Sequence, residues 1–482
     1  MLGSTEPQNS AHDPDHQLFT PRKRVHTAPI QLHNNPAPKP ELPTPFILAI
    51  TLRLAFPDLL ASSRLLLGAL YVISVPLFWG FRNAVRDVMR NREAKRLGAR
   101  VVPKVKGKWP GNIDLMVKMV KSTRTGYVAE VWDELAKEYG NTFNMRILWD
   151  DLASPFSFVS RYDLTRTPDR DHRPRRDQIR ARDWVQFVWQ GSTPTSSTRK
   201  FSGRRDIQSG WGPMEIHSAI QRREEFLKAG GDKTKPAGDT FIDDLVSSTD
   251  DRTLITDELV NILLAARDTT ASLLTFTTYL LTQHPKVLHR LREEIREHIR
   301  PDAAPTYEHI KGMKYLRAIL NETLRLFPSV PINERATLTG CSIPTASGPL
   351  YVPSGTQVLY SPLLMQRRQD LWGPDAWEFD PERWLDGRNE AFVKDPMRFV
   401  PFNAGPRICL GQQFAYNEAS FVLVRLFQRF SKLELAMDAA PPGSVPPVEW
   451  QGQYGRKGFE RVWVKNAITL YSKGGMWVRV AK

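Results

Sequence analysis

Residues 402–411 have the sequence FNAGPRICLG, and this stretch is the strongest indication of the fold in the chain. It contains Cys409, and Arg407 stands two residues before that cysteine. A helix is expected directly after Cys409, and its N-terminal amides together with Arg407 would favour the thiolate, the form of cysteine that binds metals. Gly405 and Gly411 let the backbone turn and approach a flat cofactor closely. The stretch predicts Cys409 as a metal ligand; the alternative for a lone cysteine is an inert core residue.

A second pattern, AARDTT at residues 265–270, lies inside a helix that we expect to run from about Thr256 to the break at Pro285. A threonine in mid-helix usually donates to a carbonyl of the preceding turn. Here the flanking residues are apolar, and burying an acid next to hydroxyls is costly unless the group has a function. We therefore expect Asp268 and Thr269 to be buried and to take part in the chemistry.

A third pattern pairs Glu322 with Arg325, three residues later on one face of an expected helix. Taken alone, a surface ion pair is the simpler interpretation. Arg383, in the sequence Pro381-Glu-Arg-Trp384, supplies another positive charge downstream.

With these motifs in this order, the chain resembles the cytochrome P450 family from about residue 240 to the C-terminus. The resemblance implies a mainly α-helical fold with small β-sheets, and heme b held by Cys409 as the axial thiolate ligand. It also implies that Asp268 and Thr269 conduct protons to the iron site. Three charged residues would form a buried network that supports the haem loop: Glu322, Arg325 and Arg383. The residues that it places around the haem are Phe402, Gly405, Arg407, Gly411, Arg335 and Ala265.

The motifs look most like those of fungal microsomal P450s that hydroxylate n-alkanes and fatty acids. This resemblance implies a monooxygenase that inserts one atom of O2 into an apolar substrate such as an n-alkane, a fatty acid or a xenobiotic. Electrons would come from NADPH through a membrane-bound NADPH–cytochrome P450 reductase, for which Arg398 and Arg407 are candidate docking residues. The chain departs from the family in lacking a Trp-x-x-x-Arg motif before residue 256, which would contact a haem propionate. The alternative is therefore a catalytically inactive membrane protein or haem carrier derived from a P450, arising from a defective gene model.

The N-terminal part predicts a membrane anchor. Residues 1–42 lack an apolar period and are expected to be a disordered tail, whereas residues 43–82 are hydrophobic, with an uncharged span at about 65–81. Many arginines follow this span, so the catalytic part is expected on the cytosolic side of the endoplasmic reticulum membrane, attached by a single pass. The net charge of +15 also suits an anionic lipid surface. Residues 83–112 are expected to be a basic linker with a Pro-rich hinge, and residues 113–482 the catalytic domain.

Residues 150–217 do not fit this plan. They are dense in Arg and Asp, then in Ser, Thr and Gly, and show neither a helix period nor a strand period. The family places its lid helices and part of its substrate pocket here, so we expect the distal part to be incomplete or divergent. A missed exon or an intron read in the wrong frame would explain the segment, as would a divergent lid. Nucleic-acid binding is not favoured, because Asp is mixed among the Arg and interleaved aromatic residues are missing.

Overall fold

The computed structural model describes residues 64–146, 156–159, 211–232, 236–345 and 347–481. The chain divides into two compact units, Met1–Phe78 and Trp79–Lys482. The predicted tail and most of the predicted anchor lie outside the described residues. Helix α3 (Arg64–Arg96) begins in the first unit, and its side chains are described only from Gly80 onward. In the described part of the chain, no helix combines the length and the apolar character that a bilayer crossing requires.

The residues expected to form a linker and hinge belong instead to the second unit. Strand β1 (Arg100–Val101) pairs in parallel with β6 (Leu350–Val352), and Val102 and Val105 are buried. The amide of Val105 donates to the carbonyl of Asn144 at 3.0 Å. The predicted hinge thus contains residues that pair with distant parts of the chain, which a local reading does not detect.

Two helices open the region predicted as the catalytic domain. They are α4 (Ile113–Thr125) and α5 (Glu130–Tyr139). The break falls at Gly126, whose backbone is extended and whose amide caps α4 by donating to the carbonyl of Ser122. A side chain at position 126 would collide with Ser122, so glycine is required there.

The larger sheet has four strands in the order β2-β3-β7-β4. Their bounds are β2 (Thr142–Met145), β3 (Phe156–Val159), β7 (Gln357–Tyr360) and β4 (Asn333–Ala336). Strand β3 corrects the expectation that residues 150–217 contain no strand, because it pairs with β2 and β7 at once. The smaller sheet, in the order β1-β6-β5, adds β5 (Cys341–Ile343). Strands β6 and β7 follow each other closely in the sequence but belong to different sheets.

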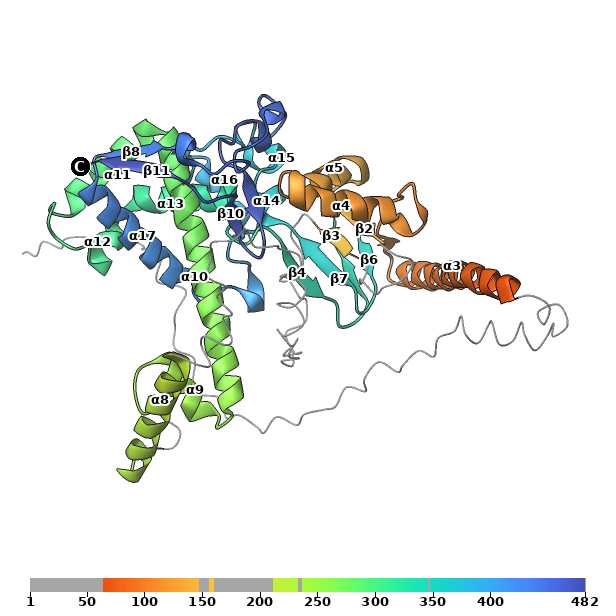
Figure 1. The fold of residues 1–482 in the computed structure, drawn as a ribbon, viewed down its shortest axis with the longest axis horizontal. Coiled ribbons are helices and arrows are strands. Elements are labelled where there is room, and N and C mark those ends of the chain that lie inside the picture. Colours follow the sequence, from red (N-terminus) through yellow and green to blue (C-terminus); the bar gives the residue numbers. More distant parts are fainter. Residues whose placement is uncertain (1–63, 147–155, 160–210, 233–235, 346, 482) are drawn as a thin grey trace, which may run out of the picture. The chain divides into compact units, whose positions relative to one another are not determined.

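The C-terminal half is mainly helical, as the sequence predicted (Figure 1). Its helices are α8 (Trp211–Lys228), α9 (Phe241–Ser248), α10 (Arg252–Gln283), α11 (Pro285–His298), α12 (Tyr307–Gly312), α13 (Lys314–Leu326), α14 (Pro362–Met365), α15 (Gln369–Trp372), α16 (Asn389–Lys394) and α17 (Gln412–Arg429). Two strand pairs complete it, β8 (Lys432–Leu435) with β11 (Val478–Ala481) and β9 (Val464–Asn466) with β10 (Leu470–Ser472). The main hydrophobic core lies where α10, α11, α13 and α17 pack together.

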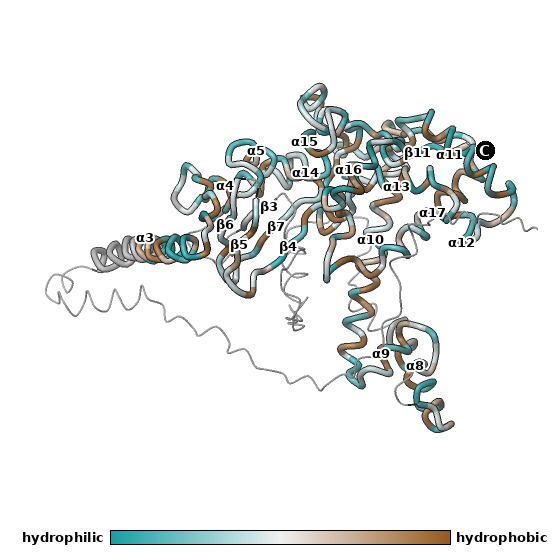
Figure 2. The backbone as a smooth tube through the Cα atoms, turned by 180° about the vertical axis from the view of Figure 1, so that it is seen from behind, coloured by the Kyte–Doolittle hydropathy of each residue, from teal (hydrophilic) through white to brown (hydrophobic). Residues whose placement is uncertain are grey.

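Helix α10 starts at Arg252, four residues before the predicted start. The carboxylate of Asp251 caps it by accepting from the amides of Thr253 and Leu254. The C-terminal half of the helix contributes residues such as Phe276 and Leu280 to the main core, whereas Ile255 near its start is buried in a separate, smaller cluster. Apolar residues occur along both halves (Figure 2), yet those at 262–264 are exposed.

Candidate functional site

The loop that carries Cys409 is fixed by backbone geometry. Asn403 and Gly405 both adopt a left-handed conformation, with φ of 62° and 70°. The amide of Cys409 donates to the carbonyl of Phe402 at 2.9 Å, which closes the loop. Helix α17 begins at Gln412 with Gly411 as its N-cap, so the cysteine precedes the helix, as the sequence predicted, although the helix starts two residues later than expected. The free amides of this N-terminus place positive potential near the thiol.

Phe402 is held from behind by Tyr416 of α17. Their ring centroids lie 5.1 Å apart, and the Tyr416 hydroxyl donates to the Asn321 side chain at 2.7 Å. Burial raises the pKa of Tyr416 to about 12, with Arg317 opposing the shift from 3.5 Å above the ring. The hydroxyl therefore keeps its proton at neutral pH and links the loop to α13.

The surroundings of Cys409 fit a flat apolar group. Cys409 is exposed, and beside it Ile408, Leu410 and Phe414 expose 53%, 93% and 63% of their surface. Large apolar side chains gathered at the surface indicate a binding site. Nowhere in the described ranges do three His, Cys, Asp or Glu side chains come together in a way that could hold a metal. The free thiol of Cys409 is of the type that ligates haem iron as a thiolate.

The charged residues behind the loop meet in a buried network. Arg325 donates to both carboxylate oxygens of Glu322, at 2.8 Å from Nε and 2.7 Å from Nη2, and both side chains are fully buried. Arg383, 3% exposed, reaches Glu322 at 3.5 Å and Asp375 at 2.9 Å. Burial lowers the pKa of Arg325, and the attraction of Glu322 opposes this shift. The interpretation of residues 322 and 325 as a surface ion pair is therefore wrong.

Two further residues complete this network, and sequence reasoning missed both. Trp384 donates its indole N–H to Glu322 at 3.0 Å. The fully buried Gln366 donates to the carbonyls of Leu324 and Arg325 and accepts from the amide of Val400 at 2.9 Å. Gln366 thus ties α13 to the segment that enters the cysteine loop. Trp384 could have been found, since it follows Arg383 directly, whereas a single glutamine belongs to no recognisable pattern.

The acid and threonine of α10 are more open than the sequence predicted. The side chain of Asp268 is 55% exposed and lies 3.9 Å from Arg267. Thr269 is half-buried, donates to the carbonyl of Ala265 at 2.5 Å, and accepts on its own carbonyl from Ser329 at 2.9 Å. The expectation of a buried pair was wrong, because the described residues leave the stretch of α10 at residues 261–268 largely uncovered. No interaction among the described residues connects this pair with the cysteine loop.

The other predicted residues differ in exposure. Arg335, on β4, is half-buried and donates one N–H to the carbonyl of Glu334 at 2.8 Å. Arg407 and Ala265 are exposed. Arg398 does not suit a docking role, because its side chain is 17% exposed, donates to the carbonyl of Leu371 and pairs with Asp395 at 3.6 Å.

Comparison with known proteins agrees with this geometry. Residues 214–446 match the family model described as Cytochrome P450. Cytochrome P450 monooxygenase himC of Aspergillus japonicus is 44% identical over 241 residues, which is 49% of this chain and 42% of that protein. Cytochrome P450 52-E3 of Starmerella bombicola is 46% identical over 40% of this chain and 38% of its own length. Cytochrome P450 52A13 of Debaryomyces hansenii is 45% identical, with 46% and 44% covered.

The chain spans about two-fifths of the length of these curated relatives. The matched region contains helices α9 to α17, with the cysteine loop and the Glu322 network. Residues 214–446 are therefore similar to the cytochrome P450 family.

Proposed function

We propose that the protein is a haem-thiolate monooxygenase that inserts one oxygen atom of O2 into a C–H bond of an apolar substrate, such as an n-alkane, a fatty acid or a xenobiotic. The observation that carries the proposal is the loop of Cys409, which presents a thiol among exposed apolar side chains and is held from behind by Gln366 and the Glu322 network. The similarity to fungal proteins named cytochrome P450 52 supports the substrate class.

Heme b, when bound, would supply an iron that receives electron density from a thiolate and can cleave O–O bonds. Cys409 would be its axial ligand. Arg335 keeps N–H donors available on β4 and would hold an anionic group of the cofactor. The Asp268 carboxylate is accessible to solvent and would take up protons, and the Thr269 hydroxyl on the next residue would pass them on. The two residues together form a route for protons along one turn of α10.

The partners and the location extend this proposal. Electrons would come from NADPH through cytochrome P450 reductase, and the exposed Arg407 suits its acidic surface. The charge pattern around residues 65–100 supports attachment to the endoplasmic reticulum membrane with the catalytic unit in the cytosol.

A carbon monoxide spectrum tests the ligand. The full chain, reduced with dithionite in the presence of CO, should give the shifted Soret band of a thiolate-ligated haem. Cys409→Ser should lose this band. The matched control is Cys341→Ser, which changes the other cysteine, half-buried in β5, and should retain it.

Turnover tests the reaction. The full chain with reductase and NADPH should consume O2 and yield hydroxylated products from dodecane or lauric acid. A shifted Soret band without any product from these substrates would identify a haem carrier and overturn the monooxygenase proposal. A band that persists in Cys409→Ser would overturn the ligand assignment.

A further inference from the structure

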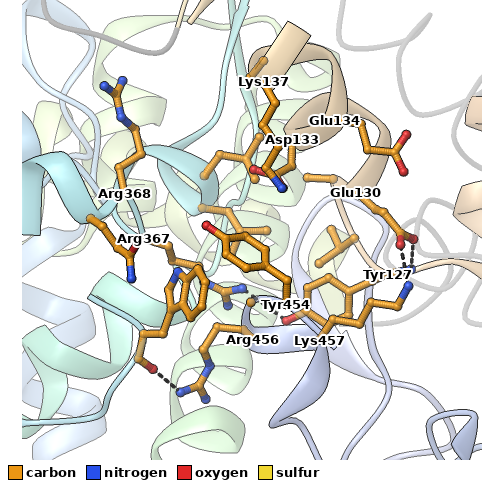
Figure 3. Close-up of a pocket in the computed structure, with 18 of the residues that line it drawn as sticks. Tyr127, Glu130, Asp133, Glu134, Lys137, Arg367, Arg368, Tyr454, Arg456 and Lys457 are labelled. Carbon is orange, nitrogen blue, oxygen red and sulfur yellow. Dashed lines mark hydrogen bonds and ion pairs between the residues drawn. The ribbon is translucent and has the colours of Figure 1, made fainter. Parts of the chain in front are cut away.

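A cavity lies in the Trp79–Lys482 unit, and no residue assigned to the haem site lines it. It has a volume of about 550 Å³ and lies between α5, the turn after α14 and the loop around Tyr454 (Figure 3). Its walls carry nine ionisable side chains besides tyrosines, four acidic and five basic. The pairing of these charges decides what the cavity can bind.

The charged side chains at the rim of the cavity, which come from α5 and include Arg368, Asp370 and Lys457, neutralise one another. Lys137 pairs with Asp133 at 2.8 Å, and Lys457 pairs with Glu130. Arg368 donates to Asp370 at 2.8 Å, and Glu134 pairs with Lys118. Each acidic side chain of the rim thus has a basic partner next to it. The rim offers no net attraction for a ligand of either sign.

The floor of the cavity, formed by Arg367 and Arg456, has an excess of positive charge. Arg367 donates to the carbonyl of Leu326 and to the Tyr127 hydroxyl, both neutral groups. Arg456, with a side chain 8% exposed, donates from Nε to Glu460 at 2.7 Å and from Nη1 to the carbonyl of Trp377 at 2.6 Å. Of these two guanidinium groups, Arg456 has a carboxylate partner, whereas the partners that Arg367 shows are neutral.

Arg456 also keeps donors available. A guanidinium has five N–H groups, and within the described ranges Nη2 of Arg456 makes no hydrogen bond. Nη2 is not among the buried unpaired atoms of the described residues, so it is open to a ligand, and an anion is the partner that a guanidinium binds best. A buried arginine that lines a cavity with unused N–H groups therefore points to an anionic ligand.

The wall beside the arginines is aromatic. Tyr454 packs edge-on against Trp377 with centroids 4.4 Å apart, and it remains 66% exposed. In Figure 3 the Tyr454 ring lies among Arg367, Arg456 and the side chains of α5. A ring at this position gives an apolar surface to the body of a ligand whose charged end reaches the floor.

We infer that this cavity binds a small monocarboxylate with a flat apolar body, its carboxylate held by Arg456 and Arg367 and its body against Tyr454. One negative charge matches the excess of one positive charge at the floor. A phosphate ester would carry a charge of about −1.5 to −2, which is more than the floor can neutralise, and it would lie close to the acidic side chains of α5. The site does not depend on the haem proposal, because none of its residues belongs to the cysteine loop or its support.

Isothermal titration calorimetry on the full chain in detergent micelles tests the assignment with sodium benzoate as the probe. Benzamide, which has the same shape without the charge, and inorganic phosphate are the comparison probes. Arg456→Gln alone would leave Glu460 buried without a partner, so the decisive variant is Arg456→Gln with Glu460→Gln, which removes both charges. Arg479→Gln changes an arginine that pairs with Asp438 at the surface and serves as the matched control.

Benzoate should bind saturably, and its Kd should rise about tenfold or more in the double variant, because a charge-assisted hydrogen bond is lost. Arg479→Gln should bind it as the unaltered chain does. Benzamide should bind at least about tenfold more weakly than benzoate. Equal benzoate affinity in the double variant, or no saturable binding to the unaltered chain, would overturn the site. Phosphate binding more tightly than benzoate would overturn the assignment to monocarboxylates.

Discussion

Arg325 donates two parallel hydrogen bonds of 2.7 and 2.8 Å to the carboxylate of Glu322, and neither side chain has any exposed surface. The remaining N–H groups of Arg325 donate to the carbonyls of Gln366, Ala376 and Glu378. One arginine therefore joins α13 to two segments more than 40 residues away in sequence. A buried charge held in this way is costly to leave without its partner.

Glu322→Gln should destabilise the second unit by about 3–5 kcal/mol, because Arg325 would remain buried with a neutral partner and Arg383 would keep Asp375 alone. Urea unfolding followed by circular dichroism measures this loss. Glu93→Gln is the matched control, since Glu93 and Arg96 have the same spacing of three residues but are exposed. It should leave the unfolding midpoint unchanged, and equal effects of the two substitutions would contradict the role given to burial.

Gln366→Leu should cost about 3 kcal/mol, because the amide of Val400 and two carbonyls of α13 would lose their partner in the core. The thiolate-type CO spectrum should also decay faster on warming, since Val400 leads into the cysteine loop. Gln413→Leu, at an exposed position of α17, should change neither quantity. If the CO spectrum of Gln366→Leu decays on warming no faster than that of the unaltered chain, the cysteine loop does not depend on Gln366 for its stability.

Asp268→Asn should separate activity from stability. The side chain is largely exposed, so the unfolding free energy should change by no more than about 0.5 kcal/mol. Turnover of the substrate should fall by about a hundredfold if Asp268 takes up protons for the reaction. Asp250→Asn, an exposed acid before α10, is the control and should keep full turnover. Unchanged turnover in Asp268→Asn would remove this residue from the proton route.

Lys465 predicts a dependence on alkaline pH. Its ammonium group donates to the carbonyls of Thr123, Arg124 and Gly126 at the end of α4. Burial, helped by Lys473, lowers its pKa to about 8. In the unfolded chain the group keeps its proton to higher pH, so between about pH 8 and the usual lysine pKa of about 10.4 the unfolded state binds more protons.

The unfolding free energy of the unaltered chain should therefore rise relative to that of Lys465→Met as the pH increases from 7 to 10. Urea unfolding of both proteins across this range measures the difference. Lys432→Met, at an exposed position of β8, should show no such trend. A difference that is constant with pH would contradict the lowered pKa.

The sequence predicted the parts of the fold that local patterns determine. The helix around Glu322 and the cysteine loop could be read from charge spacing and glycine positions, because each feature lies within about ten residues. Strand β3 could also have been recognised, since Phe156 and Phe158 alternate with serine. It was missed because the residues that surround it in the sequence are mostly polar and charged, and they determine the composition of the segment.

The rest depended on contacts between distant segments. The role of Gln366 exists only because α13 and the segment before the loop meet there. The exposure of Asp268 could not be predicted either. Its apolar neighbours along α10 suggest burial, but which neighbours cover a helix is decided by the whole fold.

The capping of α4 by Lys465 has a consequence for synthesis. The lysine that caps α4 lies 342 residues after Thr123, and Lys457, which pairs with Glu130 of α5, lies 327 residues after its partner. A growing chain leaves the ribosome from its N-terminus, so α4 and α5 are made long before these partners are. A transcript truncated before codon 457 would deprive both helices of these contacts.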